Sequence, residues 1–377
     1  MFFQPFSNWY ALGYSSFSLW KEAKSPIGSY FIHWGVFFFV IISWLAWETR
    51  QWLAVTPLSA LAKLKPYLAL IWVAVGAVAV AIFGLLYISK VEIAWFTVPL
   101  ACWAMILIFR PTLPDAKRFV LFMIATGMVI TLFVEVIVLD GDIGRMNTIF
   151  KFYLQAWIMF AISSAAAIGW MVADMRLWSH GWRNFWYVAG GLFLAGALLF
   201  TVTATSAKIN DRMVPNVPLT LDSMTYMNFA KYSEKDKEMD LSQDYRAIRW
   251  VQMNIKGSPV FLEMASHGTQ YEWSSRYAIY TGLPIVVGWQ WHEEQQRVVM
   301  PSGTVFNRGE EVWKFYGTAD LSEAKAFLEK YDVRYIVVGQ LERAFFPDGM
   351  AKFEEQDKKL WQAVYRDADT VIYQVLP

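Results

Sequence analysis

The sequence predicts a polytopic α-helical membrane domain of about six transmembrane helices, followed by a soluble α/β domain. The chain is 56% hydrophobic and only 17% charged, whereas soluble domains usually carry about 25% charged residues. Nearly every long apolar run lies before Thr205, and most of the charge lies after it. We therefore expect a transmembrane domain over residues 1–205, a polar linker over residues 206–240 and a soluble domain over residues 241–377.

Six apolar runs are long enough to cross a bilayer, which takes about 20 residues. One such run could be a buried helix of a soluble protein, but six in series are not expected in one. Trp and Tyr gather near the ends of several runs, as is typical at the level of lipid headgroups. The expected spans are Ile27–Trp47, Tyr67–Tyr87, Val91–Phe109, Phe119–Leu139, Ile149–Ala173 and Phe185–Thr205.

The basic residues of the short loops predict the orientation, because cytoplasmic loops carry an excess of Lys and Arg. Eight basic residues lie in the turns on one side and five in the turns on the other. This majority places the N-terminus, the loop at Asp140 and the soluble domain outside the cytoplasm, in a multi-pass protein of the cell membrane. The eight are Arg50, Lys63, Lys65, Arg110, Lys117, Arg118, Arg176 and Arg183, and the five are Lys21, Lys24, Lys90, Arg145 and Lys151.

The soluble domain is predicted to alternate helices with short buried strands, the pattern of an α/β layer fold. The expected elements are a helix over Gln243–Ile255, a strand over Val260–Leu262, a helix over Glu323–Lys330 capped by Ser322, a strand over Tyr335–Gly339, and an antiparallel edge pair over Trp361–Tyr365 and Thr370–Val375.

Several classes of function lack support in the sequence. The net charge of +1 argues against a nucleic-acid partner. Cys102 is the only cysteine, so neither a disulfide within the chain nor a cysteine-based zinc site is possible. The nucleophile elbow of hydrolases, the phosphate-binding loop, the dinucleotide fingerprint and the zinc protease motif do not occur in the sequence.

The most informative polar segment joins the fourth and fifth expected spans. Glu135 lies inside the end of the fourth span, Asp140 and Asp142 lie in a loop with glycines, and Arg145 precedes the fifth span. A polar stripe then follows at positions i, i+4 and i+8, one face of a helix that enters the membrane. Ionisable groups at such depth usually line a protein interior or a water-filled cavity, so they indicate a site. The stripe consists of Asn147, Lys151 and Gln155.

Two interpretations of this segment remain open. In the first, Arg145 and Lys151 hold a phosphate or pyrophosphate, while Glu135, Asp140 or Asp142 acts as a catalytic acid that binds a hydroxyl or a metal. A divalent cation, Mg²⁺ or Mn²⁺, would then be held by Asp140 and Asp142. In the second, these charges only neutralise one another at two helix ends. A calcium loop is a poor alternative, because its sixth position is not glycine and its twelfth is Lys151.

A second group of candidate substrate-binding residues lies in the soluble domain. Glu263 follows a predicted strand, where α/β folds place ligand contacts. The aromatic residues near Gly288 suit a sugar ring or an interface, although ordinary packing explains them too. A metal site of His267, His292 and Glu293 is conceivable, but no tight ligand spacing supports it. The candidates are Glu263, Trp289, His292, Glu293 and Arg297.

Residues Gly144–Trp157 read GRMNTIFKFYLQAW. This stretch closely resembles RMNTxFKFYxQxW, the signature of the Chlor_Arch_YYY family of uncharacterised polytopic membrane proteins. The second block of the family is similar to Leu262–Met264, Tyr280–Pro284 and Gly288–Glu293. The motifs Pro5–Trp9 and His33–Gly35 also resemble the family.

The layout of that family resembles the GT-C superfamily of glycosyltransferases, with many spans, an external active face and an α/β tail. The resemblance implies transfer of a sugar from a polyprenyl-phosphate donor, with membrane lipid as a partner. The chain resembles only the C-terminal half of longer members. An acidic catalytic residue of the first external loop would then precede Met1, and a separate N-terminal partner chain could complete the protein.

The rival hypothesis is a non-catalytic membrane subunit, an assembly scaffold or a transporter component. A transporter would favour broken helices and polar residues near mid-span. Here the polar residues gather at one external end, which favours a surface pocket of the kind that an enzyme uses.

Overall fold

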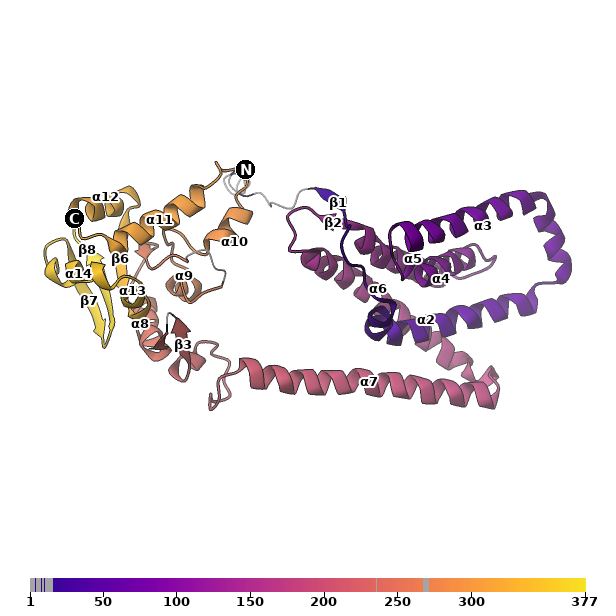
Figure 1. Cartoon of the computed structure of the whole chain (residues 1–377). Coiled ribbons are helices and arrows are strands. Elements are labelled where there is room, and N and C mark those ends of the chain that lie inside the picture. The colour runs from indigo at the N-terminus through magenta and orange to yellow at the C-terminus, as the bar shows by residue number, and fades with distance from the viewer. Residues whose placement is uncertain (1–3, 5–7, 9, 11–15, 235, 267–270) are drawn as a thin grey trace. The chain divides into compact units, whose positions relative to one another are not determined.

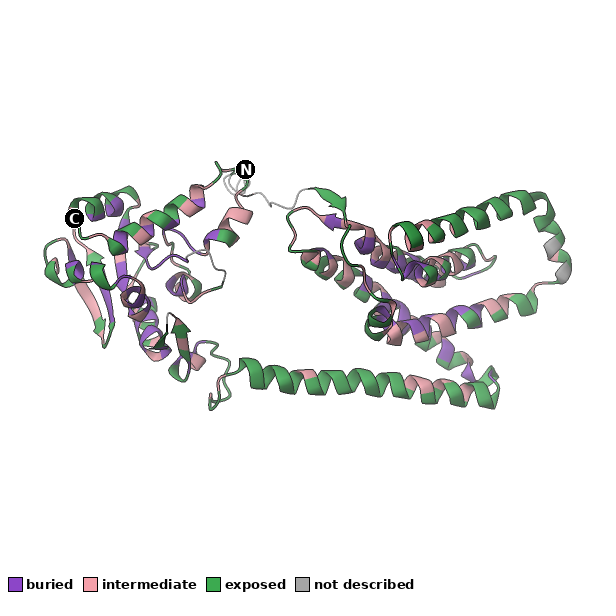
Figure 2. Ribbon diagram, viewed as in Figure 1, coloured by how far each residue is buried: buried purple, intermediate pink, exposed green. Residues whose placement is uncertain are grey.

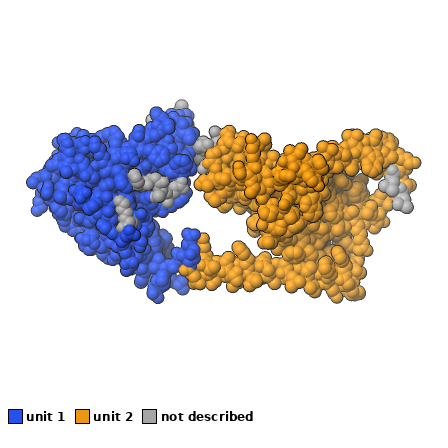
Figure 3. Space-filling view, in the orientation of Figure 1, with its two compact units in different colours: residues 1–13, 211–377 blue, residues 14–210 orange. Residues whose placement is uncertain are grey.

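The computed structural model describes residues 4, 8, 10, 16–234, 236–266 and 271–377 (Figure 1). The chain separates into two compact units (Figure 3). The helical unit comprises residues 14–210, and the C-terminal unit comprises residues 211–377 together with residues 1–13.

The helical unit is built from long apolar helices joined by short turns. Proline immediately precedes α2, η1 and α5, where its fixed φ suits the start of a helix. The described elements are β1 (Phe17–Leu19), α2 (Ile27–Val55), η1 (Leu58–Tyr67), α3 (Leu68–Phe83), the π-helical turn η2 (Gly84–Ile88), α4 (Ala94–Ile108), α5 (Asp115–Val136), β2 (Ile137–Leu139), α6 (Met146–Asp174), η3 (Met175–Leu177) and α7 (His180–Arg212).

Five helical stretches among the described residues are long and apolar enough to cross a membrane. They correspond to five of the six expected spans. The exception is the run Val91–Phe109, of which α4 contains only 15 residues, so that it counts among the shorter apolar helices. The helix starts late because the chain turns at residues 89–93, where Lys90 has a φ of 57° that an α-helix cannot include.

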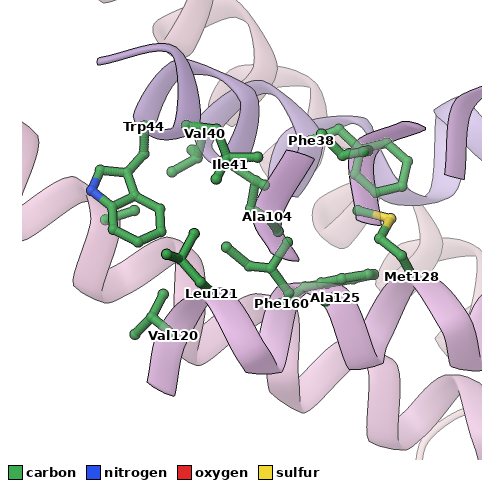
Figure 4. Close-up of a cluster of buried hydrophobic side chains, with 14 of the residues drawn as sticks. Phe38, Val40, Ile41, Trp44, Ala104, Val120, Leu121, Ala125, Met128 and Phe160 are labelled. Carbon is green, nitrogen blue, oxygen red and sulfur yellow. The ribbon is translucent and has the colours of Figure 1, made fainter. Parts of the chain in front are cut away.

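An apolar core joins α2, α4, α5 and α6 (Figure 4). Trp34 and Trp44 of α2 and Phe160 of α6 are fully buried in it. Gly127 of α5 makes room for the Phe160 ring, because a Cβ atom there would lie 2.5 Å from the ring. In contrast, the described parts of α3 and α7 contain no buried side chain (Figure 2).

The C-terminal unit combines a four-stranded sheet with helices. Its described elements are η4 (Thr225–Asn228), β3 (Lys231–Glu234), β4 (Lys237–Asp240), α8 (Leu241–Asn254), β5 (Val260–Leu262), α9 (Arg276–Thr281), α10 (Gln290–Gln295), α11 (Thr304–Gly317), α12 (Leu321–Lys330), β6 (Val333–Val338), α13 (Gln340–Phe345), η5 (Pro347–Gly349), α14 (Ala351–Glu355), β7 (Trp361–Asp367) and β8 (Thr370–Val375).

The four-stranded sheet has the order β5-β6-β8-β7. Strands β5 and β6 are parallel, and β8 pairs antiparallel with both β6 and β7. Alternate residues of β6 face opposite sides, as the pleat requires. Val337 packs in the cluster that includes α8, whereas Ile336 and Val338 pack in the cluster that includes α11 and α12. The ends of β5 and β6 therefore lie between helical layers.

Most elements expected after residue 240 are observed within a few residues of their predicted bounds. The cap of α12 differs, because Asp320 rather than Ser322 accepts hydrogen bonds from the backbone N–H groups of Ser322 and Glu323. Strand β8 is interior in the sheet, so only β7 of the predicted edge pair is an edge strand. The expected linker, residues 206–240, contains the end of α7, η4 and the β3–β4 pair.

Candidate functional site

A cluster of polar side chains lies at the end of the helical unit where α5 ends and α6 begins. We call Lys24, Ser25, Glu135 and Arg145 the polar cluster. Glu135 is fully buried, and one oxygen of its carboxylate lies 2.9 Å from the Arg145 guanidinium. Its other oxygen accepts a hydrogen bond of 2.9 Å from the Ser25 backbone N–H. The structure thus brings together two of the residues that the sequence singled out, although they come from different helix ends.

The donors of Arg145 and Lys24 are directed at protein acceptors. Arg145 donates to the Val134 carbonyl at 3.0 Å and to the Ser25 hydroxyl at 3.1 Å. The Lys24 ammonium donates to the Trp20 carbonyl at 2.5 Å and to the Glu135 carbonyl at 2.8 Å. The sequence did not mark Lys24 or Ser25 as site residues, since a single lysine and serine before a span carry no recognisable spacing. The polar cluster ties the start of α2 to the end of α5.

Asp142 serves as a local cap for α6. One carboxylate oxygen accepts from the backbone and side-chain N–H groups of Asn147, both at 3.0 Å. The other accepts from the backbone N–H and hydroxyl of Thr148, both at 2.8 Å. Burial opposes ionisation, but these hydrogen bonds prevail and lower the pKa of Asp142. Asn147, in the first turn of α6, therefore has its partner in the loop.

Asp140 is the more accessible acid of this loop. Its carboxylate accepts a hydrogen bond of 2.5 Å from the Ser16 hydroxyl, and its backbone N–H donates to the Ser16 carbonyl at 3.0 Å. Hydrogen bonds from Ser16 and Ser18 hold the pKa of Asp140 below its usual range. The antiparallel pair β1–β2 fixes this contact, because Phe17 faces Leu139 directly before Asp140. Asp140 is thus an ionised, positioned carboxylate.

Lys151 and Gln155, the remaining members of the predicted stripe, follow Asn147 on the same face of α6. Lys151 and Gln155 are exposed, whereas Thr148 and Ala156 are buried against the other helices of the unit. Within the helical unit, neither the Lys151 nor the Gln155 side chain therefore points into the helix bundle, contrary to what was expected for a polar stripe on α6.

The acids of this loop do not suit a divalent cation held by protein groups. Both oxygens of Asp142 accept hydrogen bonds from α6, which leaves Asp140 as the accessible carboxylate of the expected pair. Among the described residues, no group of three or more His, Cys, Asp or Glu side chains is placed to hold a metal ion.

In the C-terminal unit, four of the five predicted residues gather around α10. The Trp289 ring lies 5.0 Å from the Tyr271 ring, and the His292 ring lies 6.1 Å from it. Glu293 accepts a hydrogen bond of 2.7 Å from the Gly288 N–H, and Arg297 lies 3.6 Å from its carboxylate. His267, the third member of the conceivable metal site, lies outside the described residues.

Glu263 belongs to a different, fully buried group, which we call the Arg276 cluster: Asp244, Glu263, Arg276 and Glu342. The Arg276 guanidinium lies 2.8 Å from Glu342, 3.0 Å from Asp244 and 3.5 Å from Glu263. Glu263 also accepts hydrogen bonds from the backbone N–H groups of Tyr277 and Ala278. Three carboxylates thus share one cation, and burial raises the pKa of Glu263 to about 7 despite the nearby guanidinium.

Sequence reasoning missed Asp244 and Glu342. A usable signal existed, since Glu263 and Glu342 each follow a strand of the parallel pair β5–β6, whose carboxyl ends meet at one edge of the sheet. Asp244 carries no such signal, because an acid in the first turn of a helix is ordinary.

Residues 1–160 match a family model described as Uncharacterized membrane protein (DUF2298). The match includes the motif at Gly144–Trp157 and ends before the second block at residues 262–293. No curated protein matches the chain. Together, the match and the five long apolar helices support a multi-pass membrane protein.

Proposed function

We propose that the chain is a GT-C-like membrane glycosyltransferase, or the C-terminal half of one, that uses a polyprenyl-phosphate-linked sugar at the external membrane face. The observation that carries the proposal is the placement of Asp140. This carboxylate is partly exposed, hydrogen bonds from Ser16 and Ser18 lower its pKa, and it lies at the end of the helical unit that contains the buried Glu135–Arg145 pair. A donor anchored in the membrane presents its phosphate at this level.

The chemistry assigns a limited role to each residue. An ionised carboxylate can accept a hydrogen bond from the acceptor hydroxyl and orient it toward the anomeric carbon of the sugar. The new C–O bond forms as the bond from that carbon to the lipid phosphate breaks, and the hydroxyl proton passes to the departing phosphate. The lowered pKa of Asp140 suits orientation better than proton abstraction, because a general base works best with a pKa near the ambient pH. In this proposal Asp140 orients the acceptor, and Asp142 and Arg145 hold the loop. Lys151 remains the predicted phosphate contact on α6. No step depends on a metal.

The C-terminal unit contributes a surface of its own for a sugar. The group Tyr271, Trp289 and His292 offers aromatic faces beside polar atoms, which suits a sugar ring. We propose that this unit lies outside the cytoplasm, and that membrane lipid and an N-terminal-half partner chain take part.

A non-catalytic membrane subunit is the second candidate, and one observation favours it. Glu135, Asp142 and Arg145 all have partners within the chain, as expected if the charges only stabilise helix ends. A scaffold or transporter component would need no accessible acid.

Transfer from labelled donors tests the proposal. Membranes that contain the full chain would be incubated with undecaprenyl-phosphate sugars labelled in the sugar, and the label that leaves the donor would be measured. We expect transfer by the wild type and a loss of about 100-fold in Asp140→Asn. Asp115→Asn is the matched control, because Asp115 is an exposed aspartate at the opposite end of α5. Absence of transfer from every sugar tested, or equal activity of Asp140→Asn, would contradict the proposal.

A further inference from the structure

A cavity of about 570 Å³ opens at the end of the helical unit where α2 and α4 begin. Its wall consists of residues 19–26 before α2, Ile88 at the end of η2, residues 89, 90 and 92 in the turn before α4, and Val136 at the end of α5. Ligand pockets usually measure about 300–1,000 Å³, so this volume accommodates a headgroup. The wall is made by segments other than the Asp140 loop and α6, which carried the earlier predictions.

The cavity carries three lysines against two glutamates. The Lys24 ammonium is held by the Trp20 and Glu135 carbonyls, and Glu92 accepts a hydrogen bond of 3.1 Å from the Ile27 N–H at the start of α2. Within the described part of the chain, the side chains of Lys21 and Lys90 form neither an ion pair nor a hydrogen bond, and both are exposed. Two ammonium groups are therefore available to a ligand.

The start of α2 also lines the cavity, through Pro26, which provides no side-chain cap for this helix of 29 residues. The first N–H groups of a helix carry a partial positive charge. The N–H of Ile27 is already bonded to the Glu92 carboxylate, so the preference for an anion rests on Lys21 and Lys90.

The backbone that presents Lys90 is unusual. The chain enters this turn from the π-helical segment η2, and Lys90 itself has a φ of 57°. A π-helical turn and a positive φ at a residue other than glycine are both uncommon and occur often at functional sites. Here they place a lysine in the wall of the cavity.

The cavity lies at the level where lipid phosphates are expected. It adjoins the start of the candidate span Ile27–Val55 and the ends of the candidate spans Ala62–Ile88 and Asp115–Val136. Its rim includes exposed apolar side chains, since Leu19 is 63% and Ile88 is 81% exposed. A polar hollow with an apolar rim fits a ligand with an anionic head and a hydrocarbon tail.

We propose that this cavity binds a phosphate group at the membrane interface, and that Lys21 and Lys90 are its principal contacts. The inference rests on the proposed function for the identity of the donor, whereas binding of the phosphate can be measured without any transfer. It assigns the donor phosphate to the turns before α2 and α4, in place of the Lys151 contact of the proposed function, and leaves Asp140 for the acceptor.

Binding of farnesyl phosphate to the full chain in phosphatidylcholine nanodiscs tests the inference. We expect the double variant Lys21→Gln with Lys90→Gln to weaken binding by about tenfold or more, because each charge-assisted hydrogen bond is worth about that factor. The matched control is Lys63→Gln with Lys65→Gln, two exposed lysines of η1 at the other end of α2. The control should bind like the wild type, and farnesol, which lacks the phosphate, should bind to neither.

Competition experiments distinguish a free phosphate from a lipid-bound phosphate as the natural ligand. Displacement of farnesyl phosphate by inorganic phosphate would show that the anion alone suffices, and displacement only by phosphatidylglycerol in the nanodisc would indicate a lipid-bound phosphate. Both results support the site. Unchanged binding in the Lys21 and Lys90 variant, or equal loss in the control, would overturn it. Retained binding in the Lys21→Arg with Lys90→Arg variant separates loss of charge from misfolding.

The proposed sugar transfer and the proposed phosphate site can each be refuted while the other stands. Phosphate binding without sugar transfer would refute the proposed function and leave this site standing. Sugar transfer that is undiminished in the Lys21 and Lys90 variant would refute the site and leave the function standing.

Discussion

Replacement of Glu263 by glutamine tests whether the Arg276 cluster holds a proton at neutral pH. The cluster contains three buried carboxylates and one guanidinium. An unpaired buried charge is costly, so one acid should stay protonated. Glu263 is the candidate because its pKa is raised, whereas that of Glu342 is lowered: burial opposes ionisation there, but Arg276 and backbone N–H groups outweigh it. Glu263→Gln imitates the protonated acid.

The pKa values fix the size and direction of the effect. The pKa of Glu263 rises from 4.5 to about 7, and one unit corresponds to about 1.4 kcal/mol, so the shift represents about 3 kcal/mol. Between these values the folded unit binds a proton that the unfolded chain releases. The stabilisation is therefore complete below about pH 4.5 and is lost as the pH rises through 7. The contribution of Glu342 has the opposite sign and is lost only as the pH falls below 4.5.

Hydrogen exchange in the full chain measures this effect without isolating the unit. Peptides that cover β6 should be protected roughly 100-fold more at pH 5 than at pH 8, after correction for the intrinsic exchange rate. Glu263→Gln should remove most of this difference, while Glu310→Gln, at an exposed glutamate of α11, should preserve it. Equal protection of the wild type at both pH values, or an unchanged difference in Glu263→Gln, would refute the reasoning.

Three further predictions concern the helical unit. Arg145→Met should lower the stability of the helical unit by about 3–5 kcal/mol, because the substitution leaves the buried Glu135 carboxylate without its cation. Glu135→Gln in the same chain should restore much of the melting temperature, and a missing rescue would contradict the pairing. Gly127→Val should cost about 1–3 kcal/mol by overpacking a buried ring of α6, which a lower melting temperature in micelles would reveal. In a chain without its native cysteine, Asp115→Cys should resist an impermeant thiol reagent in intact cells while Lys256→Cys reacts, and the reverse pattern would invert the proposed orientation.

Apolar length was the most predictive property of the sequence. The five long helices follow from uninterrupted apolar runs, which determine a helix because backbone groups in lipid must bond internally. The run at Val91–Phe109 gives a shorter helix than its hydropathy predicts, because hydropathy does not register backbone conformation. It includes Glu92, which caps the start of α2, and it follows Lys90, whose positive φ ends the preceding helix.

The candidate site was predicted only in part. The pairing of Glu135 with Arg145 agrees with the segment that the sequence singled out, because both lie within eleven residues of one loop. Lys21 and Lys90 could not be found in this way. They belong to two turns far apart in the sequence, and only the packing of α2, α4 and α5 brings them to one cavity.

The β1–β2 pair has a consequence for the order in which this protein is made. The Ser16–Asp140 hydrogen bond joins residues 124 positions apart, and β1 has no partner until β2 emerges. At about 5–20 residues per second of synthesis, the first strand must wait roughly 6–25 s while the intervening helices are inserted. During that interval the acid-bearing loop does not yet exist, and the chain before α2 is open to chaperones and proteases. The β1–β2 pair thus forms late in biogenesis, after α5 has been inserted into the bilayer.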